Sequence, residues 1–321
     1  MVRMNRRHLL AGLVLTPLAA HAARYPERPI RVIIPYTAGG LAETIMRLLA
    51  VSIEPRLGQK LVIEAKPGAA GNIGTQEVAR AEPDGYTILV APTNNFVINQ
   101  FLLKITYDPL TALTPIAKLA DVPLVLFSNP AVPARTLPEF IAYARANPGK
   151  LNYGTPAVGT VNQLMIERLK QATGIEITHI PYRGSPEATL ALLKNDIQLF
   201  PIGLSVGIGH LREGKLTALA VAAPQRLEML PDVPTITEAG FPGYDTSNWW
   251  GMAAPAGTAP DILDALQQAV VAALQTAAVE ARYREMGMLV PKLSRQQFAA
   301  SLAAEAQLWS QTIARGNIRV E

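Results

Sequence analysis

The chain has 321 residues, of which 49% are hydrophobic and 17% are charged. This apolar content is enough to bury two medium-sized domains, so a disordered chain is excluded. The chain contains no cysteine, which excludes disulfides, thiol catalysis, thiolate metal sites and a lipid-bearing cysteine. Only His179 and His210 lie beyond the first 22 residues, so a histidine-rich metal site is excluded too. We therefore expect no metal and no cofactor.

Residues 1–22 have the pattern of an export signal. Arginines within the first seven residues precede a short apolar run, and Ala20-His21-Ala22 offers small residues at the two positions that a signal peptidase reads. The run is about a dozen residues long, against the roughly 20 that a membrane-spanning helix needs. We expect cleavage before Ala23 and a soluble periplasmic product without a lipid anchor. The twin arginine leaves the export route open between the general and the folded-protein pathway.

Removal of this signal changes the charge argument. The formal charge of the whole chain is +4, but without the three arginines of the signal 26 basic residues face 25 acidic ones. A nearly neutral mature chain without basic runs and interleaved aromatic residues does not have the footprint of a nucleic-acid-binding protein. We expect no nucleic-acid partner.

Short apolar strands alternate with helical patterns through the first third of the chain. "IRVIIP" precedes a helix from about Leu41, "KLVIEA" precedes one from about Asn72, and "YTILVAP" precedes one near residues 95–103. Such a βαβαβ series predicts a parallel sheet with helices on its faces.

The alternation restarts after "DVPLVLFSN". Helices are predicted at 137–147 and 161–173, among the strands "LNYGT", "EITHIPY", "IQLFPI" and "LTALAVAA". A Pro/Gly-rich stretch follows from Arg226, and then two long helices at 260–278 and 294–315.

These patterns predict an α/β protein of two lobes with a ligand cleft between them. The Pro/Gly-rich stretch favours a chain that crosses back to complete the first lobe. The predicted hinges lie near Val125 and Pro224. The predicted division is a signal peptide at 1–22, a discontinuous first lobe at 23–124 and 224–321, and a second lobe at 125–223.

Two adjacent glycines stand where the first strand meets its helix, in "PYTAGGLAE". The N-terminus of a helix offers free N–H groups and a positive dipole end to an anion. A phosphate-binding P-loop would end in Gly-Lys-Ser/Thr, whereas Gly40 is followed by Leu41. We expect Ala38, Gly39 and Gly40 to present N–H groups to a ligand carboxylate. The alternative is a tight turn whose glycines only pack the helix.

A similar junction recurs in the second lobe, in "YGTPAVGTVNQ". Thr155 ends a predicted strand, and Gly159 and Thr160 begin the next helix. Their hydroxyl and N–H groups form a second anion-receiving end that we expect to face the first across the cleft. A plain N-cap would explain Thr160 alone, but not the recurrence in both lobes.

Two further glycine motifs are weaker. Gly68, Gly71 and Gly74 do not have the G-x-G-x-x-G spacing of a dinucleotide site and are predicted to shape a turn. Gly203–Gly207 reads G-x-S-x-G, the pattern of a serine hydrolase's nucleophile elbow. Its only downstream histidine, His210, is five residues from Ser205, or roughly 140° around a helix. An exported serine hydrolase therefore stays as an alternative function.

Six stretches, taken together and in order, resemble a known family. They are "YPERPIRVIIPYTAGG", "KPGAAGNIGTQEVARAEPDGYTILV", "LNYGTPAVGT", "HIPYRG", "LPDVPTITEAGFPGY" and "APAGTAP". The chain is similar over nearly all of its mature length to the periplasmic solute receptors of tripartite tricarboxylate transporters, the Bug-type receptors. The resemblance implies a two-lobed, type II periplasmic-binding-protein-like fold. It also implies a monomer that captures a small carboxylate without chemistry and hands it to a membrane permease. A receptor that feeds a signalling sensor stays as an alternative.

The resemblance also implies which positions contact the ligand. In the first lobe they are Tyr36, Thr37, Ala38, Gly39, Gly40, Asn94 and Asn95; in the second they are Thr155, Gly159, Thr160, Phe200, Pro201, Ile202 and Gly203. Members of the family commonly have an acidic residue near Ile202, which would suit the ammonium group of an amino acid. The absence of that charge here favours a carboxylate with an uncharged body.

Overall fold

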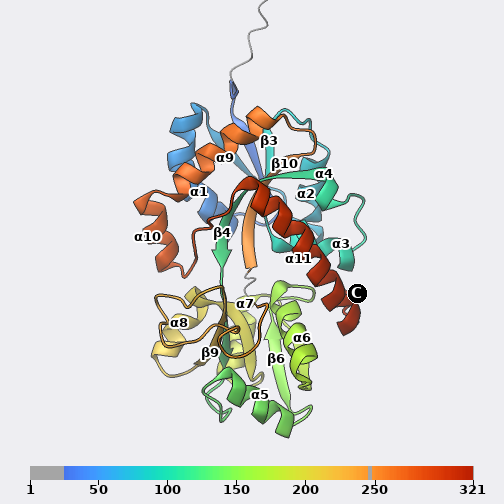
Figure 1. Ribbon diagram of the computed structural model, residues 1–321, viewed down its shortest axis with the longest axis vertical. Coiled ribbons are helices and arrows are strands. Elements are labelled where there is room, and N and C mark those ends of the chain that lie inside the picture. The colour runs from blue at the N-terminus through green and yellow to red at the C-terminus, as the bar shows by residue number, and fades with distance from the viewer. Residues whose placement is uncertain (1–24, 245–247, 321) are drawn as a thin grey trace, which may run out of the picture.

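The structure is a computed structural model that describes residues 25–244 and 248–320. The predicted signal peptide at 1–22 and its cleavage point lie outside the described residues. Two five-stranded sheets, each flanked by helices, form two lobes joined end to end (Figure 1). The predicted two-lobed α/β architecture is confirmed.

The sheet of the first lobe has the strand order β2-β1-β3-β10-β4. The strands are β1 (Ile30–Ile34), β2 (Leu61–Ala65), β3 (Thr87–Pro92), β4 (Leu113–Val122) and β10 (Asn248–Pro255). β1 pairs in parallel with β2 and β3, as the βαβαβ pattern predicts, whereas β10 runs antiparallel to both β3 and β4. The sheet is therefore mixed, because the strand that completes it comes from the far end of the sequence.

The sheet of the second lobe has the order β7-β6-β8-β5-β9. The strands are β5 (Leu124–Ser128), β6 (Leu151–Thr155), β7 (Ile177–Pro181), β8 (Leu199–Gly203) and β9 (Thr217–Ala222). Here β5 is the antiparallel member, lying between β8 and β9. All five residues of β5 are buried, as expected for a central strand covered on both faces.

The helices of the first lobe come from both ends of the chain. They are α1 (Leu41–Leu57), η1 (Ala69–Gly71), α2 (Asn72–Ala79), η2 (Asn94–Ile98), α3 (Asn99–Leu102), α4 (Pro109–Ala112), α9 (Pro260–Leu274), α10 (Ala277–Glu285) and α11 (Arg295–Gly316). The helix predicted at 260–278 is divided at Gln275 and Thr276, and the Thr276 hydroxyl bonds the Ala273 carbonyl at the break (2.8 Å).

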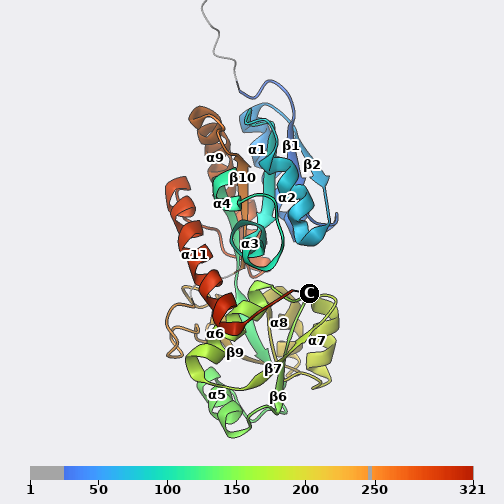
Figure 2. The ribbon, with the colours of Figure 1, turned by 90° about the vertical axis from the view of Figure 1, so that its right-hand side faces the viewer.

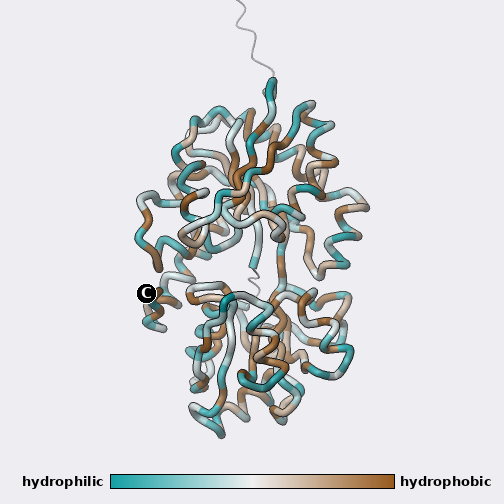
Figure 3. Tube along the Cα trace, turned by 180° about the vertical axis from the view of Figure 1, so that it is seen from behind, coloured by the Kyte–Doolittle hydropathy of each residue, from teal (hydrophilic) through white to brown (hydrophobic). Residues whose placement is uncertain are grey.

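The second lobe carries α5 (Leu137–Ala146), α6 (Val161–Thr173), α7 (Ser185–Leu193) and α8 (Leu204–Arg212). The apolar stretches of the chain run mainly through the interiors of both lobes (Figure 3). No single helix among the described residues is long and apolar enough to cross a membrane; α9 and α10 reach that length only when joined across a 66° bend.

The first crossing between the lobes is a single residue, Pro123, between β4 and β5. The return crossing comes later than expected. The N–H of Ile236 bonds the carbonyl of Val221 on β9 (2.9 Å), and Arg168 on α6 donates to the carbonyl of Gly243 (2.9 Å). Residues 224–244 thus pack on the second lobe, and the first lobe is resumed at β10, not near Pro224. Pro/Gly-rich composition indicates irregular chain but not which lobe it packs against.

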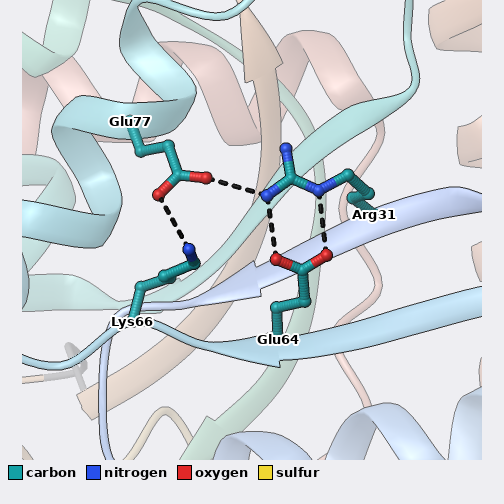
Figure 4. A network of polar contacts seen from close by, with 4 residues as sticks. All are labelled: Arg31, Glu64, Lys66 and Glu77. Atoms are coloured by element: carbon teal, nitrogen blue, oxygen red, sulfur yellow. Dashed lines mark hydrogen bonds and ion pairs between the residues drawn. The ribbon is translucent and has the colours of Figure 1, made fainter.

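Charged side chains hold the edge of the first sheet to α2. Arg31 on β1 makes two hydrogen bonds to the Glu64 carboxylate on β2 (2.9 and 2.8 Å) and a third to Glu77 on α2 (2.9 Å), while Lys66 lies 3.6 Å from Glu77 (Figure 4). The paired N–H groups of a guanidinium match a carboxylate in geometry. This network orients α2 and the turn just before it, which contributes to the site described below.

Trp249, at the start of β10, anchors the returning strand. Its indole N–H donates to the buried carboxylate of Glu305 on α11 (2.8 Å), and its ring lies 5.2 Å from the rings of Phe96 and Phe298. Its backbone N–H donates to the Thr93 hydroxyl (3.0 Å). Trp249 therefore ties α11 and η2 to the strand that enters from the second lobe. Burial raises the pKa of Glu305 above its ordinary value.

The raised pKa of Glu305 makes the free energy of unfolding depend on pH. Above the ordinary carboxyl pKa, the folded state holds the Glu305 proton more tightly than the unfolded state does, so stability falls as pH rises through the folded pKa. Glu305→Gln keeps an oxygen acceptor for Trp249 and removes this charge. We expect the free energy of unfolding of Glu305→Gln minus that of the parent to increase from pH 4.5 to pH 8, because only the parent loses stability over that range.

Urea unfolding across that pH range measures the difference. The matched control is Glu285→Gln, which changes an exposed carboxylate on α10 and should leave the difference nearly constant. A Glu305→Gln difference that is flat with pH, or that falls, would contradict the prediction.

Candidate functional site

The loop between β1 and α1 presents the first predicted anion site. Gly39 has a φ of +82°, a conformation that favours glycine, and Gly40 is the N-cap of α1 with no side-chain cap. The N–H of Gly39 donates to the Glu43 carboxylate (2.7 Å), which also accepts from Arg47 (2.7 Å). These two bonds lower the pKa of Glu43. One of the N–H groups predicted to bind a ligand thus holds a carboxylate of the chain itself.

The loop between β6 and α6 repeats this backbone arrangement in the second lobe. Gly159 has a φ of +76°, and Thr160 is an extended N-cap whose side chain does not cap the helix. The N–H of Gly159 donates to the side-chain oxygen of Gln163 (2.7 Å), four residues ahead, as Glu43 is ahead of Gly39. The acceptor is charged in the first lobe and neutral in the second. The sequence pattern predicts the two helix ends but misses these two acceptors, although the shared spacing was a signal for them.

A cavity of about 260 Å³ lies where these two parts of the lobes meet. It is lined by Tyr36, Ala70, Asn94, Asn99, Leu102, Leu103, Ala157, Val158, Gly159, Thr160 and Val320. The Asn94 side chain donates to the Gly159 carbonyl (2.9 Å) and so joins the two lobes directly. None of the described residues that line the cavity has a charged side chain: their polar groups are amides, hydroxyls and backbone.

The structure brings four of the predicted contact residues to this cavity: Tyr36, Asn94, Gly159 and Thr160. The residues at 37–40 are exposed on the neighbouring loop and do not line it. The stretch 200–202 is buried within the second sheet, where Phe200 and Ile202 are core residues, and Gly203 is partly exposed at the start of α8.

Asn95 lies behind the cavity. It is 1% exposed, accepts a hydrogen bond from the Tyr36 hydroxyl (2.8 Å) and donates to Thr75 (3.1 Å). Asn99, which the sequence analysis does not single out, lines the cavity and donates to the Ala70 carbonyl (3.1 Å). The helical turn from Asn94 to Asn99 thus positions Tyr36 and the turn before α2 on one wall.

Thr155 is fully buried and fastens the loop of the second lobe. Its hydroxyl donates to the Ala157 carbonyl (2.8 Å), which also accepts from the Thr160 hydroxyl (3.1 Å). The Thr155 hydroxyl also lies 2.6 Å from Nε2 of His179. Because its single proton goes to Ala157, we assign the second bond to a His179 Nε2–H donor. Burial lowers the pKa of His179 to about 4, so the ring is neutral at pH 7.

The serine of the G-x-S-x-G stretch has no base in the described part of the chain. Ser205 is exposed on the first turn of α8, and no hydrogen bond there joins it to His210 or to His179, which is engaged by Thr155. Among the same residues, no group of three or more His, Cys, Asp or Glu side chains is placed to hold a metal ion.

Comparison with known proteins decides the family. The family model described as "Tripartite tricarboxylate transporter family receptor", TctC, matches residues 45–318. The chain belongs to this receptor family. A TctC-family chain is a solute receptor, not an enzyme, so membership sets the serine hydrolase alternative aside.

Three solved structures similar to this TctC receptor support the same fold. The periplasmic binding protein BugD is 31% identical, with a TM-score of 0.74 over 92% of this chain and all of that one. A Rhodopseudomonas palustris protein solved with adipate is 32% identical, with a TM-score of 0.78 over 92% and 99%. MatC of that organism, solved with bound malate, is 31% identical, with a TM-score of 0.74 over 90% and 100%. The fold is that of a periplasmic binding protein.

The tight packing around Gly159 predicts a specific sensitivity. A Cβ added there would lie 2.7 Å from Leu102 Cδ1 and 3.2 Å from Val320 Cγ2, whereas one added at Gly149, with a similar φ of +71°, would meet nothing within 4 Å. Both alanine variants bear the left-handed backbone cost of roughly 1–2 kcal/mol. We expect Gly159→Ala to lose more stability than Gly149→Ala in urea unfolding, because it also forces Leu102 to move. Equal losses of unfolding free energy in the two variants would contradict this prediction and show that Leu102 can move at no measurable cost.

Proposed function

We propose that this receptor captures a small carboxylate in the periplasm and delivers it to the permease of a tripartite tricarboxylate transporter. The observation that carries the proposal is the pair of matched helix ends, one in each lobe, whose glycine N–H groups already hold side-chain oxygens at 2.7 Å. Two of the similar structures were solved with carboxylates, adipate and malate, which supports the proposal.

Backbone donors suit this task because they are preset. Removing a carboxylate from water is costly, and charge-assisted hydrogen bonds offset that cost best where the donors need no reordering. Glu43 shows that the Gly39 N–H can bind a carboxylate, and no side chain caps the N–H groups that follow it in α1. A ligand carboxylate can bind these neighbouring groups or displace the acceptor already present.

The cavity also constrains the body of the ligand. Its wall contains Leu102, Leu103, Val158 and Val320, and none of the described residues that line it has an acidic side chain that could pair with an ammonium group. A buried ammonium without a partner is strongly disfavoured. The proposed ligand is therefore a carboxylate whose body is uncharged, in preference to an amino acid.

Binding without chemistry requires the lobes to open and close around the ligand. In this proposal the hinges lie at Pro123 and where the chain resumes the first lobe at β10. The proposal also includes export, cleavage before Ala23 and action as a monomer. Asn94 already joins the lobes through Gly159, so closure would tighten a contact that exists.

A panel of ligands tests the proposal. We expect isothermal titration of the mature protein to show one-to-one binding of at least one plain mono-, di- or tricarboxylate. Aspartate and glutamate should bind at least about tenfold more weakly, which corresponds to roughly 1.4 kcal/mol. Native mass spectrometry of gently purified protein identifies any ligand that is carried along. Preferential binding of the amino acids would contradict the proposed ligand class.

Two variants of the first helix end separate backbone geometry from side-chain charge. Gly39→Val places a β-branched residue at a φ of +82° and should displace the loop, weakening carboxylate binding by about tenfold or more. Glu43→Gln keeps an oxygen for the Gly39 N–H, as Gln163 does for Gly159, and removes a negative charge beside the ligand. It should bind at least as tightly as the parent. Equal affinities for both variants and the parent would remove the helix-end proposal.

A further inference from the structure

The segment that follows α11 is held in place between the lobes. Asn317 has a left-handed backbone with a φ of +46°, which ends the helix and turns the chain back. The N–H of Ile318 then bonds the Ile313 carbonyl (3.1 Å), and the Ile318 side chain is 9% exposed in the core. Figure 2 shows the chain running from the end of α11 along the level at which the two lobes meet. The positions of the residues after the helix are therefore set by packing.

Among the described residues of this segment, Val320 lines the proposed ligand cavity. It lines the cavity together with Tyr36 and Asn94 of the first lobe and Gly159 of the second. A Cβ built on Gly159 would lie 3.2 Å from Val320 Cγ2, so the valine side chain sits directly against this loop. Val320 thus belongs to the wall where both lobes contribute.

A second cavity, of about 450 Å³, lies on the other side of this wall. It is bounded by α2 and by the segment from Leu103 to Tyr107, with apolar surface from Ile73 and Ile105. Ala70, Leu103 and Val320 line both cavities. Of these three, Ala70 has only a methyl group, and Leu103 is the first residue of the segment that bounds the second cavity. Val320 is the shared side chain supplied by the separate C-terminal segment.

We propose that Val320 is a specificity-determining residue that limits how long the uncharged body of the bound carboxylate can be. The inference rests on the proposed function and names its ligand class further: carboxylates with a short aliphatic body. The first cavity, at about 260 Å³, is slightly smaller than the roughly 300–1,000 Å³ of typical ligand sites. Without the Val320 side chain it opens toward a space that falls within that range.

Opening this wall should change which ligand lengths are favoured. Each additional methylene that a cavity buries improves affinity by about fourfold, as long as the cavity has room for it. In the parent protein, that gain in affinity should end at the ligand length at which the aliphatic chain of the ligand meets Val320. In Val320→Gly it should continue into the second cavity, and in Val320→Trp it should end sooner.

The experiment is isothermal titration of full-length mature protein with unbranched dicarboxylates and monocarboxylates of increasing length. We expect the best-bound length to increase by at least two carbons in Val320→Gly, with affinity for those longer ligands rising at least tenfold. We expect it to decrease in Val320→Trp. The control is Val51→Ala on α1, a valine that is 74% exposed, and its length profile should match the parent.

The outcomes separate the two proposals. A parent protein that binds neither a ligand of this series nor any mono-, di- or tricarboxylate of the panel above contradicts the carboxylate proposal itself. A parent that binds, with Val320 variants that keep its length preference, overturns the role of Val320. A uniform loss of affinity at every length also overturns it, because a merely structural residue would act in that way. Thermal unfolding of each variant checks that it is folded. If the larger side chain of Val320→Trp prevents folding, the length profile of Val320→Gly alone decides the test.

Discussion

The antiparallel pairing of β4 with β10 is the constraint on which the rest of the structure depends. It runs from Leu113–Pro255 at one end to Val122–Asn248 at the other, so both chain crossings leave the first sheet at the same place. Trp249 then ties this pair to α11 and η2 through Glu305 and Thr93. Because the crossing strands are held together, the two lobes face each other through the same loops, and a binding site between those loops has a defined geometry.

The site that results is built mainly from backbone. Each lobe contributes a strand, a glycine in a left-handed conformation, an uncapped helix end and an acceptor four residues after the glycine. The supporting side chains act behind the loops: Thr155 and Thr160 share the Ala157 carbonyl, and Asn95 positions the Tyr36 hydroxyl. Selectivity is then assigned to the apolar wall, where Val158, Leu102 and Val320 meet. In the proposed function, charge recognition and recognition of the ligand body are therefore assigned to different residues.

Local patterns predicted most elements, because strand alternation and helix periodicity are written into short stretches of sequence. They failed where a distant segment decides the outcome. β10 runs antiparallel in a sheet that the first three strands predict to be parallel, and residues 224–244 stay with the second lobe through bonds such as Ile236 to Val221. Thr155 illustrates the same limit for a side chain: local patterns do not predict that its hydroxyl contacts His179, which lies on the neighbouring strand β7.

The sequence by itself determined the two α/β series, the family and the recurrence of glycine-led helix ends at Gly39 and Gly159. These features depend on residue type and on short spacings along the chain, which can be recognised without knowing the fold. Only the tertiary structure decided that Glu43 and Gln163 accept hydrogen bonds from those N–H groups, and that Asn99 and, from the far end of the sequence, Val320 line the cavity. The physical reason is that a contact between residues remote in sequence depends on packing, and packing is determined jointly by all the elements that surround it.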